Sequence, residues 1–169
     1  MKNDKTGEKK FNKYDYDPFD QWIWRDYEGK NKVDPQEFVE SRQDDYIFIG
    51  TDSQCYSKKR VTIFSTVIIA YRMGRGGTII MSKDKTTFMD SLRQRLMMEA
   101  MRSLEAAWFV DKFLPPENVI TIHLDVNQNL KWKSARYKDE LVGLVAGQGF
   151  KALCKPNAWA ASRVADKRC

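Results

Sequence analysis

The stretch YIFIGTDSQ, residues 46–54, decides how the rest of the chain is interpreted. Alternate residues of a strand point to opposite faces, which puts Phe48 and Asp52 on one face and Ile49 on the other. Because both faces are apolar, the pattern predicts a central strand that is covered on both sides. Asp52 is an unusual end for such a strand, since a buried lone carboxylate is costly without a cation or several donors. The pattern indicates either a functional site or an Asp that caps a local turn.

The composition is that of an ordinary globular domain. The chain has 169 residues, of which 42% are hydrophobic and 12% aromatic, enough for one domain with a core. No apolar run reaches the length of a membrane span, and the first ten residues, MKNDKTGEKK, lack the apolar centre of a signal peptide. The three cysteines match no zinc pattern and are expected to be reduced thiols. We therefore expect a cytoplasmic protein with no membrane partner.

The positive charge is concentrated near the C-terminus. The net charge is +6, and residues 128–169 contain nine Lys or Arg and three Asp or Glu. Trp132, Tyr137, Phe150 and Trp159 are interleaved with these cations. Clustered cations with aromatic rings favour a nucleic-acid partner, RNA, DNA or a hybrid. The alternative is a basic helix face that only water covers.

The first 44 residues differ from the rest. They are predicted to form a polar tail and an aromatic N-terminal arm, followed by a short helix over Pro35–Ser41 with Asp34 as its N-cap. The aromatic segment, residues 11–27, is expected to pack on the domain or to contact a protein partner. Residues 45–169 are predicted to form the domain itself.

The remaining elements predict an α/β fold. Apolar, β-branched runs and helical spacing indicate three antiparallel strands, then helix, strand, helix, strand and helix. The fold class is therefore a five-stranded mixed sheet with helices on both faces. The expected strands are residues 46–54, 61–72, 78–82, 119–126 and 149–154, and the expected helices are residues 88–113, 134–145 and 158–167. Thr87 is the expected N-cap of the first of these helices.

Acidic side chains fall on four of these elements. Asp52 and Asp125 each end an apolar strand, and parallel neighbouring strands bring such ends to one edge of the sheet. Glu99 on the long helix and Asp166 on the last helix complete the set. Carboxylates gathered in this way need a cation, and hard oxygen ligands suit Mg²⁺ or Mn²⁺. Two such ions are a standard means of hydrolysing a phosphodiester bond.

Each of these residues also has a purely structural interpretation. Glu99 is alternatively an exposed residue that pairs with Arg95 or Arg102. Asp166 is alternatively a surface residue that pairs with Arg163. His123, two residues before Asp125, is either a proton-transfer group or a buried structural imidazole, and the latter is favoured.

A second group of residues is expected to contact nucleic acid. Ser53, Gln54 and Asn127 are candidates for touching the scissile phosphate or ordering metal-bound water, with turn and capping roles as the alternative. The candidates for phosphate-backbone contacts are Lys131, Lys133, Arg136 and Lys155. Their alternative is a solvated surface.

Four segments resemble a known family in the same order. IGTDSQ, RLMMEAMRSLE, IHLDVNQNLKWKS and CKPNAWAASRVAD are similar to the YkuK-type family of RNase H-like proteins of bacteria and phages. The resemblance implies an RNase H-like fold and a metal-dependent nuclease. It implies that Asp52 bridges two metal ions, that Asp166 joins one of them, and that Glu99 and Asp125 bind the other. The alternatives are a non-catalytic nucleic-acid-binding module and a phage-encoded protein-interaction module on the same fold.

Overall fold

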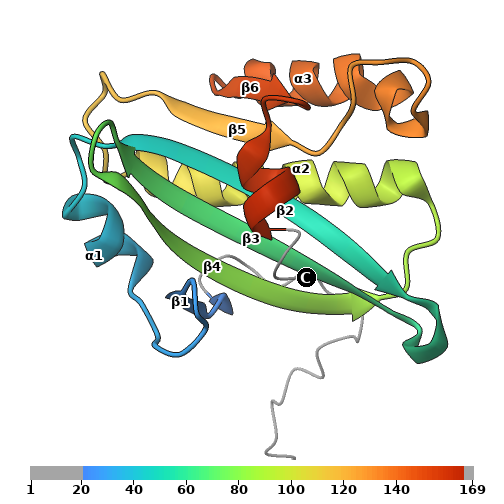
Figure 1. The fold of residues 1–169 in the computed structure, drawn as a ribbon, viewed down its shortest axis with the longest axis horizontal. Helices are drawn as coiled ribbons and strands as arrows, with labels where there is room; N and C mark the ends of the chain where they lie inside the picture. Colours follow the sequence, from blue (N-terminus) through green and yellow to red (C-terminus); the bar gives the residue numbers. More distant parts are fainter. Residues whose placement is uncertain (1–20, 166–169) are drawn as a thin grey trace, which may run out of the picture.

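The computed structural model describes residues 21–165, apart from the side chains of residues 161 and 162. A single mixed sheet organises the chain, with the strand order β1-β4-β3-β2-β5-β6 (Figure 1). Its strands are β1 (Trp24–Asp26), β2 (Tyr46–Tyr56), β3 (Val61–Arg72), β4 (Gly76–Thr87), β5 (Ile120–Leu124) and β6 (Lys151–Cys154). The helical elements are α1 (Pro35–Glu40), η2 (Ser57–Lys59), α2 (Leu92–Asp111), η3 (Lys133–Tyr137), α3 (Lys138–Gly147) and η4 (Ala160–Ala165).

The directions of the strands follow the predicted order. β2, β3 and β4 form an antiparallel meander, whereas β5 is parallel to β2, and β6 is parallel to β5. The meander is long because β3 is apolar on both faces, pairs along its whole length with β4, and pairs with β2 from Val61 to Tyr71. The mixed α/β architecture is therefore confirmed.

The predicted number of five strands was wrong, because the sheet has six. The additional strand, β1, pairs antiparallel with β4 through three residues and comes from the segment that we predicted as an arm. Three residues are too short to show an alternating pattern in the sequence. Trp24 is nonetheless buried in the core at 2% exposure, which fixes β1 to the sheet.

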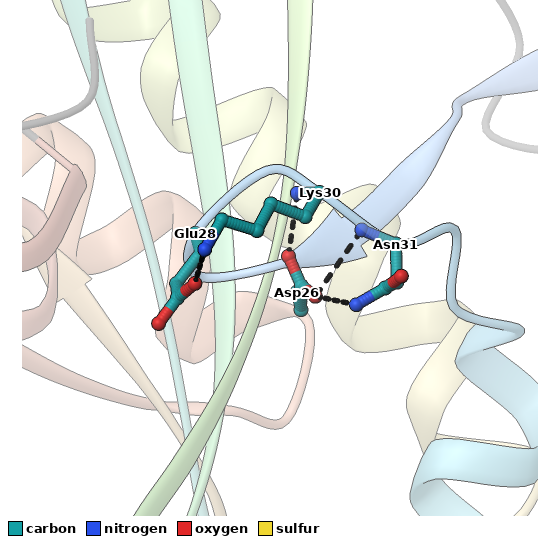
Figure 2. A network of polar contacts seen from close by, with 4 residues as sticks. All are labelled: Asp26, Glu28, Lys30 and Asn31. Carbon is teal, nitrogen blue, oxygen red and sulfur yellow. Dashed lines mark hydrogen bonds and ion pairs between the residues drawn. The ribbon is translucent and has the colours of Figure 1, made fainter.

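A network of polar contacts turns the chain back after β1 (Figure 2). The carboxylate of Asp26 accepts hydrogen bonds from the backbone N–H of Lys30 at 2.8 Å and from the side-chain amide of Asn31 at 2.6 Å. Gly29 takes the turn's left-handed position with φ at 76°. Burial opposes ionisation of Asp26, but the hydrogen bonds from Asn31 and Lys30 outweigh it and lower the pKa of this carboxyl.

Helix α2 covers the back of the sheet in Figure 1. Its small and apolar residues pack with the inner residues of β2 and β5, so that Ile49, Ala100, Leu104 and Ile122 are fully buried. Truncating a core leucine such as Leu104 to alanine typically costs about 2–5 kcal/mol of stability. The alanines on the face of α2 that packs against the sheet let the helix axis lie near the strands.

The C-terminal element η4 covers the front of the sheet. Ala160 and Ala165 pack on Val67, Ile69 and Met81 in a second, smaller cluster. Helical elements on both faces of the sheet are therefore confirmed. Among the predicted features, residues 1–20 of the tail and arm and residues 166–169 lie outside the described part.

Several element boundaries differ from the prediction. β4 extends to Thr87, where Val61 is its partner, so Thr87 is a strand residue. Helix α2 begins at Leu92, and Ser91 caps it by accepting the N–H of Gln94. The predicted helix over residues 134–145 is divided into the 3-10 turn η3 and helix α3. No helix in residues 21–165 combines the length and the apolar character that a bilayer crossing demands.

Candidate functional site

The pairing of β2 with β5 places Asp52 beside Asp125. The last parallel pair of these strands is Gly50 with His123, and each Asp follows its strand's member of that pair by two residues. β5 ends at Leu124, so Asp125 lies just beyond a strand end as predicted. Asp52, however, does not end its strand. β2 continues to Tyr56 because its antiparallel partner β3 keeps pairing after β5 has departed.

Glu99 reaches this region from helix α2 and is buried, with 5% of its surface exposed. Its Oε1 accepts a hydrogen bond of 2.5 Å from the hydroxyl of Ser53, the neighbour of Asp52 on β2. Arg95, one helical turn before Glu99, points its Nη1 at the same hydroxyl at 3.5 Å. The alternative of an exposed Glu99 is wrong, because the helix turns this residue toward the sheet.

The charge environment of Glu99 is unfavourable for a carboxylate. Burial raises its pKa well above the ordinary value, and the nearby charge of Asp52 raises it further. The hydrogen bond from Ser53 lowers the pKa, Asp125 raises it, and Arg95 lowers it. Glu99 therefore interacts electrostatically with both acidic residues of the sheet edge, although the three come from distant parts of the chain.

Lys155 provides the positive charge next to Asp125. Its ammonium nitrogen lies 2.5 Å from Oδ1 of Asp125, and the two form an ion pair. The backbone positions it, because the N–H of Lys155 donates to the carbonyl of Val126 at 3.0 Å. This contact joins the segment after β6 to the segment after β5.

These side chains line one cavity of about 660 Å³. The predicted site residues that line it are Asp52, Ser53, Glu99, Asp125, Asn127, Lys131, Lys133 and Lys155. Gln54 and Arg136 do not line it. Gln54 is exposed and accepts a hydrogen bond from the hydroxyl of Tyr56, while Arg136 is exposed and donates to the carbonyl of Lys133. Asp166 lies outside the described residues.

The cavity also contains residues that the sequence did not single out as site residues. Arg95 lines it four positions before Glu99, a spacing that indicates the same helix face. Trp132 is 60% exposed at the rim, between the two predicted lysines. Ser134 accepts the backbone N–H of Asn127 at 3.3 Å and holds the loop after β5 in place. The spacing of Arg95 from Glu99 could have identified Arg95 from the sequence. The Ser134 contact could not be predicted in this way, because it depends on how the loop folds.

His123 takes the structural role that the sequence favoured. It is 1% exposed, and its ring lies 5.2 Å from the rings of both Phe48 and Trp159. Its Nδ1 accepts the backbone N–H of Ala160 at 2.9 Å, which ties η4 to the sheet. Burial lowers the pKa of His123 to about 4.

The donors of the site decide which metal ion it could hold. Within residues 21–165, no three His, Cys, Asp or Glu side chains form a group that could hold a metal ion. The donors that share the cavity, Asp52, Glu99 and Asp125, are nevertheless of the hard oxygen type that Mg²⁺ and Mn²⁺ prefer. Burial is the main cause of the raised pKa of Glu99, and the charge of Asp52 raises it further. The donor chemistry thus fits such an ion.

The comparisons with known proteins gave one match. Residues 34–169 match a family described as Ribonuclease H-like. No curated protein and no solved structure matches the chain. The matched range begins at the N-cap of α1 and includes every residue that lines the cavity.

Proposed function

The chain belongs to the ribonuclease H-like family, as its YkuK-type motifs predicted, and on this premise we propose that it is a metal-dependent nuclease. The proposed reaction is hydrolysis of phosphodiester bonds in RNA, DNA or a hybrid. The proposed metal ligands are Asp52, Glu99, Asp125 and Asp166, with Mg²⁺ or Mn²⁺ as the two ions. The observation that supports this most is the shared electrostatic environment of Glu99, Asp52 and Asp125 in one cavity.

The proposed roles follow from where each side chain lies. Divalent ions held by these carboxylates would supply an activated water and stabilise the leaving oxygen. Ser53 keeps Glu99 oriented through its 2.5 Å hydrogen bond, and Arg95 points at the same hydroxyl. Lys131 and Lys133 line the cavity, and in this proposal they would contact the phosphates that flank the scissile bond.

The decisive experiment is a cleavage assay with matched variants. The purified chain is incubated with labelled RNA, DNA and RNA–DNA hybrid oligonucleotides in Mn²⁺, in Mg²⁺ and in chelator. We expect cleavage only with metal, and a loss of about 100-fold or more in Asp52→Asn and Asp125→Asn, as for other side chains that stabilise a transition state. Glu117→Gln, an exposed residue remote from the cavity, is the control and should cleave at the wild-type rate. Cleavage that survives in Asp52→Asn would exclude the proposed site.

A second candidate function is a nucleic-acid-binding module without catalysis. The ion pair of Lys155 with Asp125 favours it, because the ammonium group already compensates one of the carboxylates. Binding of oligonucleotides that weakens with salt, combined with no cleavage in either metal, would select this function. The same assay therefore separates the two candidates.

A further inference from the structure

Exposed cations gather at the far end of the meander, beyond the candidate site. They are Lys58, Lys59, Arg60, Lys83 and Lys85, which together we term the basic tip. The first three belong to the turn between β2 and β3, at the lower right of Figure 1, and the last two to β4. The tip is separate from the basic C-terminal quarter of the chain.

Strand register puts Lys83 and Lys85 of the tip on the same face of the sheet as Asp52. Asp52 pairs with Ser65, which in turn pairs with Lys83, so the three form one row across β2, β3 and β4. The next row on that face is Gln54, Ile63 and Lys85. A ligand that lies over Asp52 therefore meets lysine side chains as it crosses the sheet.

The charges of the tip are not neutralised by nearby acids. None of its five residues forms an ion pair within the part of the chain that the structure describes. The intervening Asp84 points to the opposite face, where it pairs with Arg102. An uncompensated cluster of this kind attracts a polyanion.

The basic tip also contains a cleft that suits the phosphate backbone of a nucleic acid. Lys59, Arg60 and Lys85 line a cleft of about 630 Å³ together with Phe88. The guanidinium of Arg60 lies 4.8 Å from the centroid of the Phe88 ring, which holds one cation in place. Cations along a groove with aromatic rings beside them are the arrangement that tracks a phosphate backbone.

We propose that the basic tip binds the phosphate backbone of the nucleic acid whose strand occupies the candidate site. The inference rests on the substrate class of the proposed function and adds a surface to it. Asp52 and Tyr56 are four residues apart on β2, about 13 Å at the usual rise of a strand. At about 3.4 Å per base-pair step, the tip would contact phosphates roughly four steps from the scissile bond.

The test measures the salt dependence of binding in chelator, so that no cleavage occurs. The probes are a 20-base-pair RNA–DNA hybrid, a DNA duplex of the same length and a 20-nucleotide single strand, followed by fluorescence anisotropy. The variant is K59Q/R60N/K85Q, with Asn at position 60 because its φ of 53° is left-handed. The control is R75Q/K112Q/K151Q, which removes the same charge from exposed residues at the opposite end of the strands, in the β3–β4 turn, after α2 and at the start of β6.

The expected result is a smaller slope of log affinity against log salt concentration. Each lost phosphate contact reduces the slope by about 0.9 on a DNA duplex, so the triple variant should lose about 2.7 while the control keeps the wild-type slope. A second variant, K58Q/K83Q, replaces only side chains on ordinary backbone and should lose about 1.8 by the same rule. This double variant gives an independent measurement of the slope if the triple variant does not fold.

Three outcomes would overturn the proposal. They are wild-type slopes in both tip variants, an equal loss of slope in the control, and tighter binding of poly-glutamate than of any of the nucleic acids. These measurements also distinguish a wrong proposal for the basic tip from a wrong proposal for the nuclease. Unchanged slopes with metal-dependent cleavage exclude the tip alone, and reduced slopes without cleavage exclude the nuclease alone.

Discussion

Asp52 and Asp125 stand at the same level of the sheet, each two residues past the last β2–β5 pair, although 72 residues separate them in the chain. Their proximity is a product of parallel register, because strands that pair in parallel bring equivalent positions to one edge. Burial of Glu99 next to both of them turns this edge into a region where negative charge is costly.

Glu99→Gln should stabilise the fold at alkaline pH. Because the pKa of Glu99 is raised in the folded state, its contribution to stability is present below the unfolded pKa and is lost as pH rises through the folded pKa. The variant should therefore melt above the wild type at pH 8, and the difference should shrink toward pH 4. A change of 1 kcal/mol shifts Tm by about 2–4 °C in a chain of this size.

The wild type and Glu99→Gln can also be compared to test metal binding. Mn²⁺ should raise the Tm of the wild type at pH 8 more than that of Glu99→Gln, because binding to the folded state stabilises it. Equal shifts would show that Glu99 is not a ligand. The pH and metal series can be measured by differential scanning fluorimetry.

Lys155→Gln should strengthen binding of Mn²⁺ and weaken binding of nucleic acid. The ammonium group competes with a cation at Asp125, and pairs of this exposure are worth about 0.2–1 kcal/mol. Removing it should tighten Mn²⁺ binding by roughly 1.5- to 5-fold on that scale, measured by isothermal titration calorimetry. Lys151→Gln, at the other end of β6, is the control, and a parallel gain there would point to a general charge effect.

Asp84→Asn should be strongly destabilising, whereas Glu140→Gln should not. Arg102 is 2% exposed, donates from Nε and Nη2 to Asp84, and stacks 3.8 Å from the centroid of Phe64. Removing the carboxylate from a buried pair costs about 3–5 kcal/mol, because a charge is left uncompensated. Arg93 and Glu140 form a similar two-bond pair at the surface, where water screens the charges, so its loss should be small. Urea unfolding of both variants compares them, and equal losses would contradict this reasoning.

His123 should make the fold sensitive to mild acid. Its pKa falls from 6.5 to about 4 on folding, so the stabilising effect is complete above pH 6.5 and is lost as pH falls toward 4. Between pH 7.5 and 5 the loss should be on the order of 2 kcal/mol. His123→Gln should unfold with less pH dependence over this interval. The chain has one histidine, so NMR can follow its titration directly, and a pKa near 6.5 would refute the prediction.

The sequence predicted best what local pattern determines. Strand β3 was predicted with its observed bounds, Val61–Arg72, because its β-branched run is bounded by turns on both sides. The start of α2 was displaced because pairing with β3 keeps residues up to Thr87 in β4, and no local signal shows how far a neighbour extends. The same limit applies to β1, whose three residues are a strand only because β4 lies beside them.

In the candidate site, too, local patterns could be predicted and contacts between distant segments could not. Asp52, Glu99 and Asp125 could be identified because each stands out against an apolar strand or helix stripe. The Lys155 ion pair could not, since it depends on two loops meeting after β5 and β6. The basic tip was missed for a related reason, because Lys83 and Lys85 join the turn only through cross-strand register.

Directly beneath the acidic residues, the hydroxyl of Thr51 lies 3.0 Å from that of Thr66 and 2.9 Å from that of Ser103. Thr51 precedes Asp52 on β2, and Ser103 follows Glu99 by one turn of α2. These buried hydroxyls hold β2 and α2 at a defined distance, whichever oxygen donates. The spacing of the Asp52 and Glu99 carboxylates is thus established when the chain folds. An arriving ion or substrate would therefore use little of its binding energy to reorganise them.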